Sequence, residues 1–300
     1  MTITVFTPAY NRARLLPVLY NSLCDQTFRD FEWLIVDDGS SDNTEDVVKT
    51  FIEERKLNIV YFKKQNGGKH TAVNYGVQRA NGELFFIVDS DDKLPNDSLE
   101  LVAKYYEPIK ENHEFAGVCG LKAYFNGDLL PGSINYEVFD CRGLDYSYRC
   151  GSLAGGDIAE IIVKTEIIKK YPFPEFVGEK FCAESAIWEP IGEIYKFRYF
   201  NKTIYLCEFL EDGLSANSLR SRMSCPLSAM YIYSNRCTFD IPIKEKIKSA
   251  INYWRFYFCN KKDVYPKIQY IYKVFFLLGL IFHIADLKRS RRRLKIGRER

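Results

Sequence analysis

Residues 84–92 read LFFIVDSDD, five consecutive apolar residues followed at once by acids and a serine. Residues 31–38, FEWLIVDD, repeat the pattern. A short apolar run that ends in carboxylates is typical of a buried parallel strand, whose carboxyl end lies at the edge where open α/β sheets bind ligands. Acids this close together repel one another unless a cation or a hydroxyl-rich ligand lies between them. The two stretches therefore predict a site for a metal ion and a nucleotide.

Strand patterns and helix patterns alternate through the first hundred residues. Strands are expected at 3–10, 31–38, 58–64 and 84–92, and helices at 14–26, 44–55, 69–80 and 95–108. This alternation predicts a parallel, doubly wound sheet. Further strands are expected at 116–125 and 200–210, a strand running into a short helix at 158–171 and a helix at 180–197. We expect residues 126–156 to be irregular and the chain beyond about residue 215 to be helical.

The net charge of +3 conceals a basic C-terminus. Residues 288–300 carry eight Lys or Arg and one Glu, a net +7, which leaves −4 for the rest of the chain. Such a cluster is attracted to anionic lipid; a solvated tail is the alternative. Nucleic acid is disfavoured because no recognition motif accompanies the charge. The apolar run at 274–284 has eleven residues, too few to cross a bilayer core of about 30 Å, so we predict a core helix or an interfacial helix and no spanning segment.

Nine cysteines are scattered along the chain without a CxxC pair. The first ten residues already form a strand pattern rather than a secretory signal. Reduced thiols in a cytosolic protein are therefore expected.

Asp89 and Asp91 form the sharpest motif. Two carboxylates at a strand end suit a hard divalent ion that also holds phosphate oxygens. A helix-capping turn is the alternative, for which Asp92 alone would serve. A calcium loop of the EF-hand type is excluded, since its sixth position requires Gly and here is Leu94.

Three other segments carry polar groups suited to a nucleotide. Asp37 and Asp38 can accept hydrogen bonds from a base or a ribose, although they can also cap the following helix. Tyr10 can stack on a base, and Arg12 can meet a ribose or a phosphate. Lys69 opens a helix after Gly67-Gly68, where a diphosphate is favoured. The chain contains neither a Walker A loop nor a GxGxxG motif.

Taken together, PAYNR, VDDGSSDNT, NGGKHTAVNYG and VDSDD resemble the family-2 glycosyltransferases of the GT-A fold. The resemblance is close over residues 1–110 and looser to about residue 190. It implies a GT-A-like, Rossmann-type, mostly parallel sheet flanked by helices, here with a helical C-terminal extension. It also implies a nucleotide-sugar donor, usually a uridine diphosphate sugar, and a hydroxyl of a polysaccharide or lipid-linked precursor as acceptor.

The resemblance also assigns roles to individual residues. The base and ribose would lie against Pro8, Tyr10, Arg12, Asp37 and Asp38. Lys69 would sit near the donor phosphates, Asp89 and the adjoining Ser90 near the ribose or the metal, and Asp91 would bind Mn²⁺ or Mg²⁺.

Inverting members of the family usually take their catalytic base from an acidic pair just before a helix in the second half. The matching stretch here is 182–188, CAESAIW, in which Ser185 stands where many members have Asp. Glu184 is the predicted base and Glu179 the alternative; Glu184 can also be a carboxylate that stabilises a helix N-terminus. Asp157 is a candidate for the acceptor site.

The resemblance thus implies a metal-dependent, inverting hexosyl- or N-acetylhexosaminyltransferase, and we expect it in the cytoplasm, peripheral on the inner face of the membrane. A non-catalytic nucleotide-sugar-binding module and a sugar nucleotidyltransferase are the alternatives. We expect one domain over 1–215, with the donor half at 1–110 and the acceptor half at 111–215. A helical extension at 216–287 and a basic tail at 288–300 follow.

Overall fold

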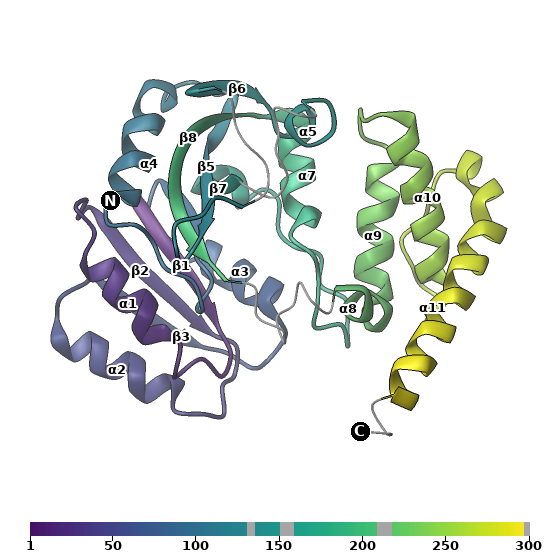
Figure 1. The fold of residues 1–300 in the computed structure, drawn as a ribbon, viewed down its shortest axis with the longest axis horizontal. Coiled ribbons are helices and arrows are strands. Elements are labelled where there is room, and N and C mark those ends of the chain that lie inside the picture. Colours follow the sequence, from purple (N-terminus) through teal and green to yellow (C-terminus); the bar gives the residue numbers. More distant parts are fainter. Residues whose placement is uncertain (131–135, 151–158, 209–217, 297–300) are drawn as a thin grey trace. The chain divides into compact units, whose positions relative to one another are not determined.

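The computed structural model describes residues 1–130, 136–150, 159–208 and 218–296 (Figure 1). The chain divides into two compact units. The sheet unit comprises Met1–Phe173 and Ile187–Glu211, and the helical unit comprises Pro174–Ala186 and Asp212–Arg300.

The sheet unit is built on an eight-stranded sheet of order β3-β2-β1-β4-β7-β5-β8-β6. The first four strands, all parallel, are β1 (Ile3–Ala9), β2 (Phe31–Asp37), β3 (Ile59–Lys63) and β4 (Leu84–Ile87). The others are β5 (Phe115–Tyr124), β6 (Val138–Arg142), β7 (Ala159–Lys164) and β8 (Lys196–Cys207). Of these, β5 and β8 are parallel to each other, whereas β7 and β6 run antiparallel to their neighbours. The predicted mostly parallel α/β sheet is confirmed.

Helices cover both faces of this sheet (Figure 1). The helices α1 (Leu16–Cys24), α2 (Thr44–Glu54) and α4 (Ser98–Tyr106) pack their apolar residues into the main core with the strand residues Trp33 and Phe86. The helix α3 (Lys69–Val77) lies on the other face, against Phe6. A Cβ at Gly76 would lie 2.1 Å from the Phe6 ring, so glycine is required for this close approach. The order of strand and helix brings the carboxyl ends of β1, β2 and β4 to one edge.

The shorter elements of the sheet unit connect these layers. They are η1 (Glu107–Ile109), α5 (Gly143–Tyr148) and α6 (Thr165–Ile168). The helix α7 (Ser185–Ile194) begins in the helical unit and continues into the sheet unit. Sequence reasoning missed β6 and α5, which fall in the region expected to be irregular. The residues of β6 are exposed or only partly buried, so the strand lacks the apolar alternation by which strands are recognised.

The helical unit contains α8 (Ser218–Ser224), α9 (Pro226–Arg236), α10 (Ile243–Tyr257), η3 (Tyr270–Phe275) and α11 (Phe276–Ile296). Its core is formed by α9 and α10, with Met230, Tyr253 and Phe256 almost fully buried. The predicted helical C-terminus is confirmed.

The last helix is longer than the sequence suggested. The stretch Tyr270–Arg289 is long and apolar enough to cross a membrane, by length and composition only, and 17% of the apolar window in it is buried. The prediction of no spanning segment rested on the uncharged run at 274–284 and underestimated this length. Length and composition do not distinguish a span from a helix on the surface of a protein.

Candidate active site

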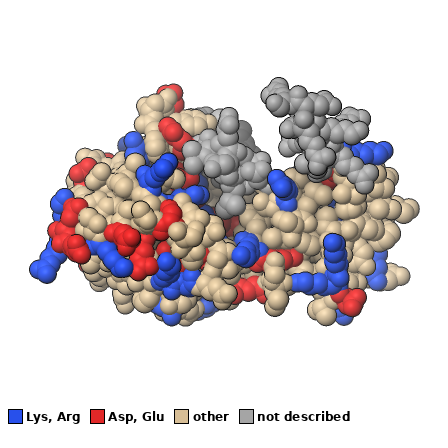
Figure 2. Space-filling model, turned by 90° about the horizontal axis from the view of Figure 1, so that it is seen from below, with Lys and Arg blue, Asp and Glu red and all other residues tan. Residues whose placement is uncertain are grey.

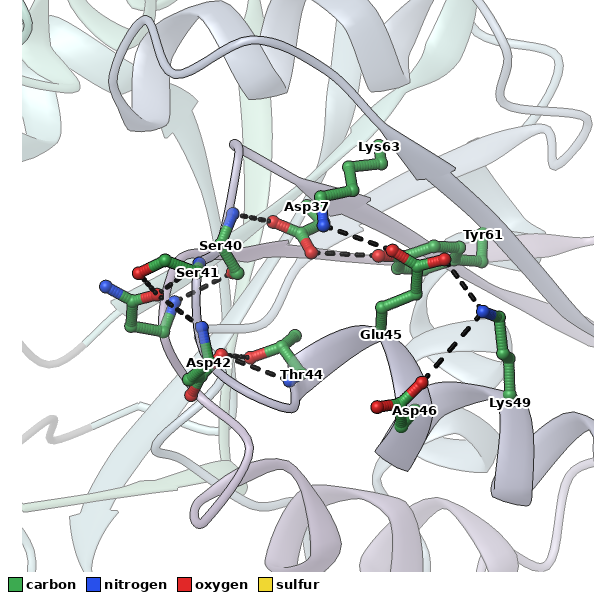
Figure 3. Close-up of polar contacts among 11 residues, drawn as sticks. Asp37, Ser40, Ser41, Asp42, Thr44, Glu45, Asp46, Lys49, Tyr61 and Lys63 are labelled. Atoms are coloured by element: carbon green, nitrogen blue, oxygen red, sulfur yellow. Dashed lines mark hydrogen bonds and ion pairs between the residues drawn. The ribbon is translucent and has the colours of Figure 1, made fainter.

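The loop after β1 and the turn after β2 are locked together by hydrogen bonds (Figure 3). Asn11 has a φ of 55°, and its Oδ1 accepts a hydrogen bond of 2.9 Å from the Ser41 N–H. The Asn11 N–H in turn donates to Ser40 Oγ over 2.8 Å. The backbone N–H of Arg12 donates to Thr44 Oγ1 over 2.9 Å. These contacts fix the backbone from which the side chain of Arg12 projects.

Asp37 lies at the end of β2 and is fully buried. Its carboxylate accepts hydrogen bonds from the Ser40 N–H over 2.7 Å and from the Tyr61 hydroxyl over 2.8 Å (Figure 3). Burial and this bond to Asp37 raise the pKa of Tyr61 above its usual range. In this structure Asp37 therefore holds the turn after β2 against β3, and a contact with a base or ribose stays a prediction.

Asp38 is 3% exposed and organises the turn before α3. Its Oδ1 accepts hydrogen bonds from Lys64 Nζ over 2.6 Å and from the Gly67 N–H over 2.9 Å. Its Oδ2 accepts them from the Gly68 N–H over 2.6 Å and from Asn66 Nδ2 over 3.2 Å. Because each carboxylate oxygen has two lone pairs, four donors saturate the group. Asp38 thus sets the geometry of the glycine turn, while its predicted role toward a base or ribose stays a prediction.

The glycine turn places Lys69 at the first position of α3, where it meets Asp89. Its ammonium group lies 2.7 Å from Asp89 Oδ1 and 2.8 Å from Oδ2, and the two side chains are 25% and 38% exposed. The backbone N–H of Asp89 donates to the Tyr205 hydroxyl over 3.0 Å. A predicted phosphate-binding lysine and a predicted metal-binding carboxylate are therefore in direct contact.

Asp91 belongs to the same cluster. Burial, and next the charge of Asp89, raise its pKa, whereas the charges of Arg12 and Lys69 act to lower it. Arg12, Lys69, Asp89 and Asp91 come from segments far apart in the sequence, and each is close enough to affect the titration of Asp91. The structure thus gathers two cationic and two anionic side chains at the edge of the sheet.

Asp92 has a different environment from its two acidic neighbours. It is 8% exposed, and its Oδ2 accepts a hydrogen bond of 2.6 Å from the Tyr205 hydroxyl. Burial is the main reason why its pKa is raised to about 8, and the charges of Asp89 and Asp91 add to the effect. Tyr205, on β8, thus braces the acidic loop at both of its ends.

The donor set suits a divalent ion. Asp89 and Asp91 are hard oxygen ligands; burial is the main cause of the raised pKa of Asp91, and the charge of Asp89 adds to it, a repulsion that a cation between the two carboxylates would relieve. Over the described part of the chain, no three or more His, Cys, Asp or Glu side chains gather as a metal site. One or two carboxylates together with substrate phosphates are, however, a usual set for Mg²⁺. The residues present therefore fit the implied ion.

The other predicted donor residues lie on the same edge. Pro8 is the second-to-last residue of strand β1 and is partly buried, Tyr10 is 48% exposed, and Ser90 is 3% exposed between the two acids. The exposed ring of Tyr10 leaves it available for stacking, whereas buried Ser90 is better suited to shaping the loop. Sequence reasoning missed Lys64 and Tyr205, because neither belongs to a motif.

The two candidate bases differ in their surroundings. Glu179 is 7% exposed, and its carboxylate accepts hydrogen bonds of 2.7 and 2.8 Å from the N–H groups of Leu227 and Ser228. The Ser228 hydroxyl adds a third bond of 2.7 Å. Glu179 therefore caps the first turn of α9, which argues against the alternative assignment of this residue as base.

Glu184 is partly exposed and immediately precedes α7. Both glutamates belong to the helical unit. The role of Glu184 as base stays a prediction, and Asp157 lies outside the described residues.

Comparisons with known proteins identify the family and the fold of the chain. The profile of the family described as Glycosyl transferase family 2 matches residues 4–156. The chain is 26% identical over 230 residues to glycosyltransferase GlyA of Streptococcus pneumoniae, covering 73% of this chain and 30% of that protein. It is 32% identical over 218 residues to the minor teichoic acid biosynthesis protein GgaB of Bacillus subtilis, covering 71% and 23%. The chain thus spans less than a third of the length of these two relatives.

Solved structures share the fold. Residues 1–349 of Staphylococcus aureus TarS, in complex with UDP-GlcNAc, align with a TM-score of 0.61 at 22% identity, covering 86% of this chain and 73% of that chain. The mannosyltransferase PcManGT of Pyrobaculum calidifontis, in complex with GDP-Man and Mn²⁺, aligns with a TM-score of 0.52 at 16% identity, covering 99% and 79%. Both likenesses confirm a GT-A-like fold.

Proposed function

Because the chain belongs to glycosyl transferase family 2, we propose that it transfers a sugar from a nucleotide diphosphate sugar to an acceptor hydroxyl. The observation that carries the proposal is the ion pair of Lys69 with Asp89. Asp91 lies close enough to Asp89 and to Arg12 for their charges to affect its pKa. Such a cluster offers cationic groups to a diphosphate and carboxylates to a divalent ion. A uridine diphosphate sugar is the favoured donor, and the TarS complex with UDP-GlcNAc supports this choice.

Each residue of the cluster has a distinct task in this proposal. Lys69 and the N-terminus of α3 attract the negatively charged donor phosphates. Arg12 offers a planar set of donors to a ribose or phosphate oxygen, and exposed Tyr10 offers its ring to the base. Asp89 and Asp91 hold Mn²⁺ or Mg²⁺, which would neutralise negative charge on the leaving nucleoside diphosphate.

Proton removal from the acceptor is assigned to Glu184. A sugar hydroxyl is a poor nucleophile, and a carboxylate that accepts its proton during attack makes it a better one. Attack opposite the departing diphosphate inverts the configuration at the anomeric carbon. Glu179 is unsuited to the task because three hydrogen bonds engage its buried carboxylate.

The acceptor is proposed to be a hydroxyl of a cell-surface polymer or of its lipid-linked precursor. GgaB is named for teichoic acid biosynthesis. TarS, 31% identical over 140 residues, is a poly(ribitol-phosphate) β-N-acetylglucosaminyltransferase. These names support a polyol-phosphate or glycan acceptor.

The decisive experiment measures uridine diphosphate release and its binding in the presence of Mn²⁺. Asp91→Asn keeps the shape of the side chain and removes its charge, so turnover should fall about 100-fold or more if the carboxylate holds the ion. Binding of uridine diphosphate, followed by calorimetry, should depend on Mn²⁺ in the native protein and lose that dependence in the variant.

Asp46→Asn is the matched control, because Asp46 is an exposed acid on α2 with a side chain 77% exposed. The control should behave as the native protein. Turnover of Asp91→Asn equal to that of the control would refute the metal site. Metal-dependent binding without any release of uridine diphosphate would instead indicate a nucleotide-sugar-binding module.

A further inference from the structure

The last helix of the helical unit exposes a continuous row of large aliphatic side chains. On α11, Leu277, Ile281 and Ile284 are 68%, 61% and 43% exposed. At 3.6 residues per turn these three positions lie on one side of the helix. We call these three residues the α11 stripe, which Val274, 75% exposed in η3, precedes. Exposed apolar side chains are common singly, but a contiguous row marks a surface that contacts something else.

The opposite side of α11 is the one that packs within the unit. Gly279 lies against α10 so closely that a Cβ would be 2.3 Å from Trp254 Cβ. Asp286 is 4% exposed and forms a two-pronged ion pair with Arg255 of α10, with distances of 2.5 and 2.7 Å. In the preceding η3, the backbone carbonyl of Tyr272, a residue 8% exposed, accepts a hydrogen bond from the Trp254 indole N–H. This seam fixes the rotation of α11, and the stripe therefore faces away from α10.

Positive charge follows the stripe directly. Lys288 and Arg289 are exposed on the continuation of the same helix, and residues 288–300 carry a net charge of +7. The part of Figure 2 that contains α11 shows mostly uncharged surface, with Lys and Arg side chains among it. An apolar row beside a basic cluster complements an anionic lipid surface, where aliphatic groups enter the acyl boundary and cations meet the headgroups.

The seam also distinguishes lying on a membrane from crossing it. The segment Tyr270–Arg289 meets the length and composition of a span. A spanning α11 would have to give up the Arg255–Asp286 pair or take α10 into the bilayer with it. The first half of α10 carries Lys244, Glu245, Lys246 and Lys248, and charged residues are unfavourable in the bilayer core. A helix bound along one side and apolar on the other fits the membrane interface.

We propose that the helical unit docks on an anionic membrane through the α11 stripe, with α11 lying in the plane of the interface. The basic residues from Lys288 onward supply the electrostatic attraction. This proposal is independent of the chemistry at the sheet edge. It extends the membrane attraction predicted from the basic tail by naming an apolar surface that inserts.

The test is flotation of the full-length protein with vesicles of phosphatidylcholine alone or mixed with phosphatidylglycerol. The native protein should float with the mixed vesicles and much less with the neutral ones. Leu277→Glu combined with Ile281→Glu should reduce flotation about tenfold, since two charges replace inserted side chains. Lys288→Glu combined with Arg289→Glu should weaken binding and its dependence on salt.

The matched control is Val177→Glu combined with Val264→Glu, which adds the same charge at positions 90% and 85% exposed in the same unit. It should float as the native protein does. Unfolding curves check that the variants are folded, and Leu277→Asn with Ile281→Asn replaces the glutamates if they are not.

Three results would overturn the proposal. Equal flotation of the stripe variant and the control would show that the stripe does not insert. If light scattering shows that the native protein dimerises through the stripe, and the protein does not float with vesicles, the stripe contacts a second copy of the chain instead. Resistance to alkaline carbonate extraction would show that the helix spans the bilayer.

Discussion

Two acidic pairs lie at the ends of buried strands of the sheet unit, and their carboxylates differ in burial and in the groups around them. Asp37 and Asp38 are 0% and 3% exposed and accept hydrogen bonds from groups of the neighbouring turns. Asp89 is 38% exposed, and its charge helps to raise the pKa of Asp91. An acid surrounded by donors builds the site, whereas an acid crowded by another acid retains affinity for a cation. Because the two sequence patterns are alike, the different roles of the two acidic pairs come from the groups that folding places around them.

The largest expected effect is a difference in stability between variants of the two acidic pairs. Asp38→Ala removes the carboxylate that pairs with the Lys64 ammonium group and accepts from two backbone N–H groups, which leaves a mostly buried positive charge without its anionic partner. The free energy of unfolding should fall by about 3–5 kcal/mol. Asp89→Ala removes a partly exposed ion pair and should cost about 1 kcal/mol or less.

Urea unfolding of both variants measures this contrast. Similar losses for Asp38→Ala and Asp89→Ala would show that burial does not distinguish the two pairs.

A second contrast concerns the two glutamates of the helical unit. Glu179→Gln weakens the cap of α9, because a neutral amide oxygen is a poorer acceptor and its N–H₂ group opposes the N–H donors. A loss of about 1–2 kcal/mol in unfolding free energy is expected. Glu184→Gln should keep stability and donor binding but lose transfer to the acceptor.

Thermal unfolding, donor binding and product formation are measured on both variants. Transfer that survives in Glu184→Gln would remove this residue from the role of base.

A third contrast compares two tyrosines that hold the two acidic loops. Tyr61→Phe removes a hydrogen bond to Asp37, and Tyr205→Phe removes bonds to Asp92 and to the Asp89 backbone. Each should cost about 1–2 kcal/mol of stability. Tyr205→Phe alone should also weaken Mn²⁺-dependent nucleotide binding, because the loop that carries the acids loses its brace.

Calorimetric titration of uridine diphosphate with Mn²⁺ tests this difference. An equal change in affinity for the two variants would contradict the inference that Asp37 supports the fold whereas the loop with Asp89 and Asp91 binds the ion.

Much of the sheet unit could be predicted from local patterns. Apolar runs located β2 and β4, and the glycine turn located the start of α3 at Lys69. The strand β6 was missed because its residues are largely exposed or only partly buried, which erases the alternation. The length of α11 was missed because charged residues end the apolar run, although the helix continues through them to Ile296.

The sequence by itself determined that acids end buried strands, since an apolar run specifies a buried strand and parallel strands bring their carboxyl ends to one edge. Only the tertiary structure decided what each acid does. Asp38 is saturated by a turn 29 residues away, Glu179 caps a helix 48 residues away, and Tyr205 reaches Asp89 across 116 residues. The physical reason is that burial and hydrogen bonding depend on groups brought close by folding, which no local pattern contains.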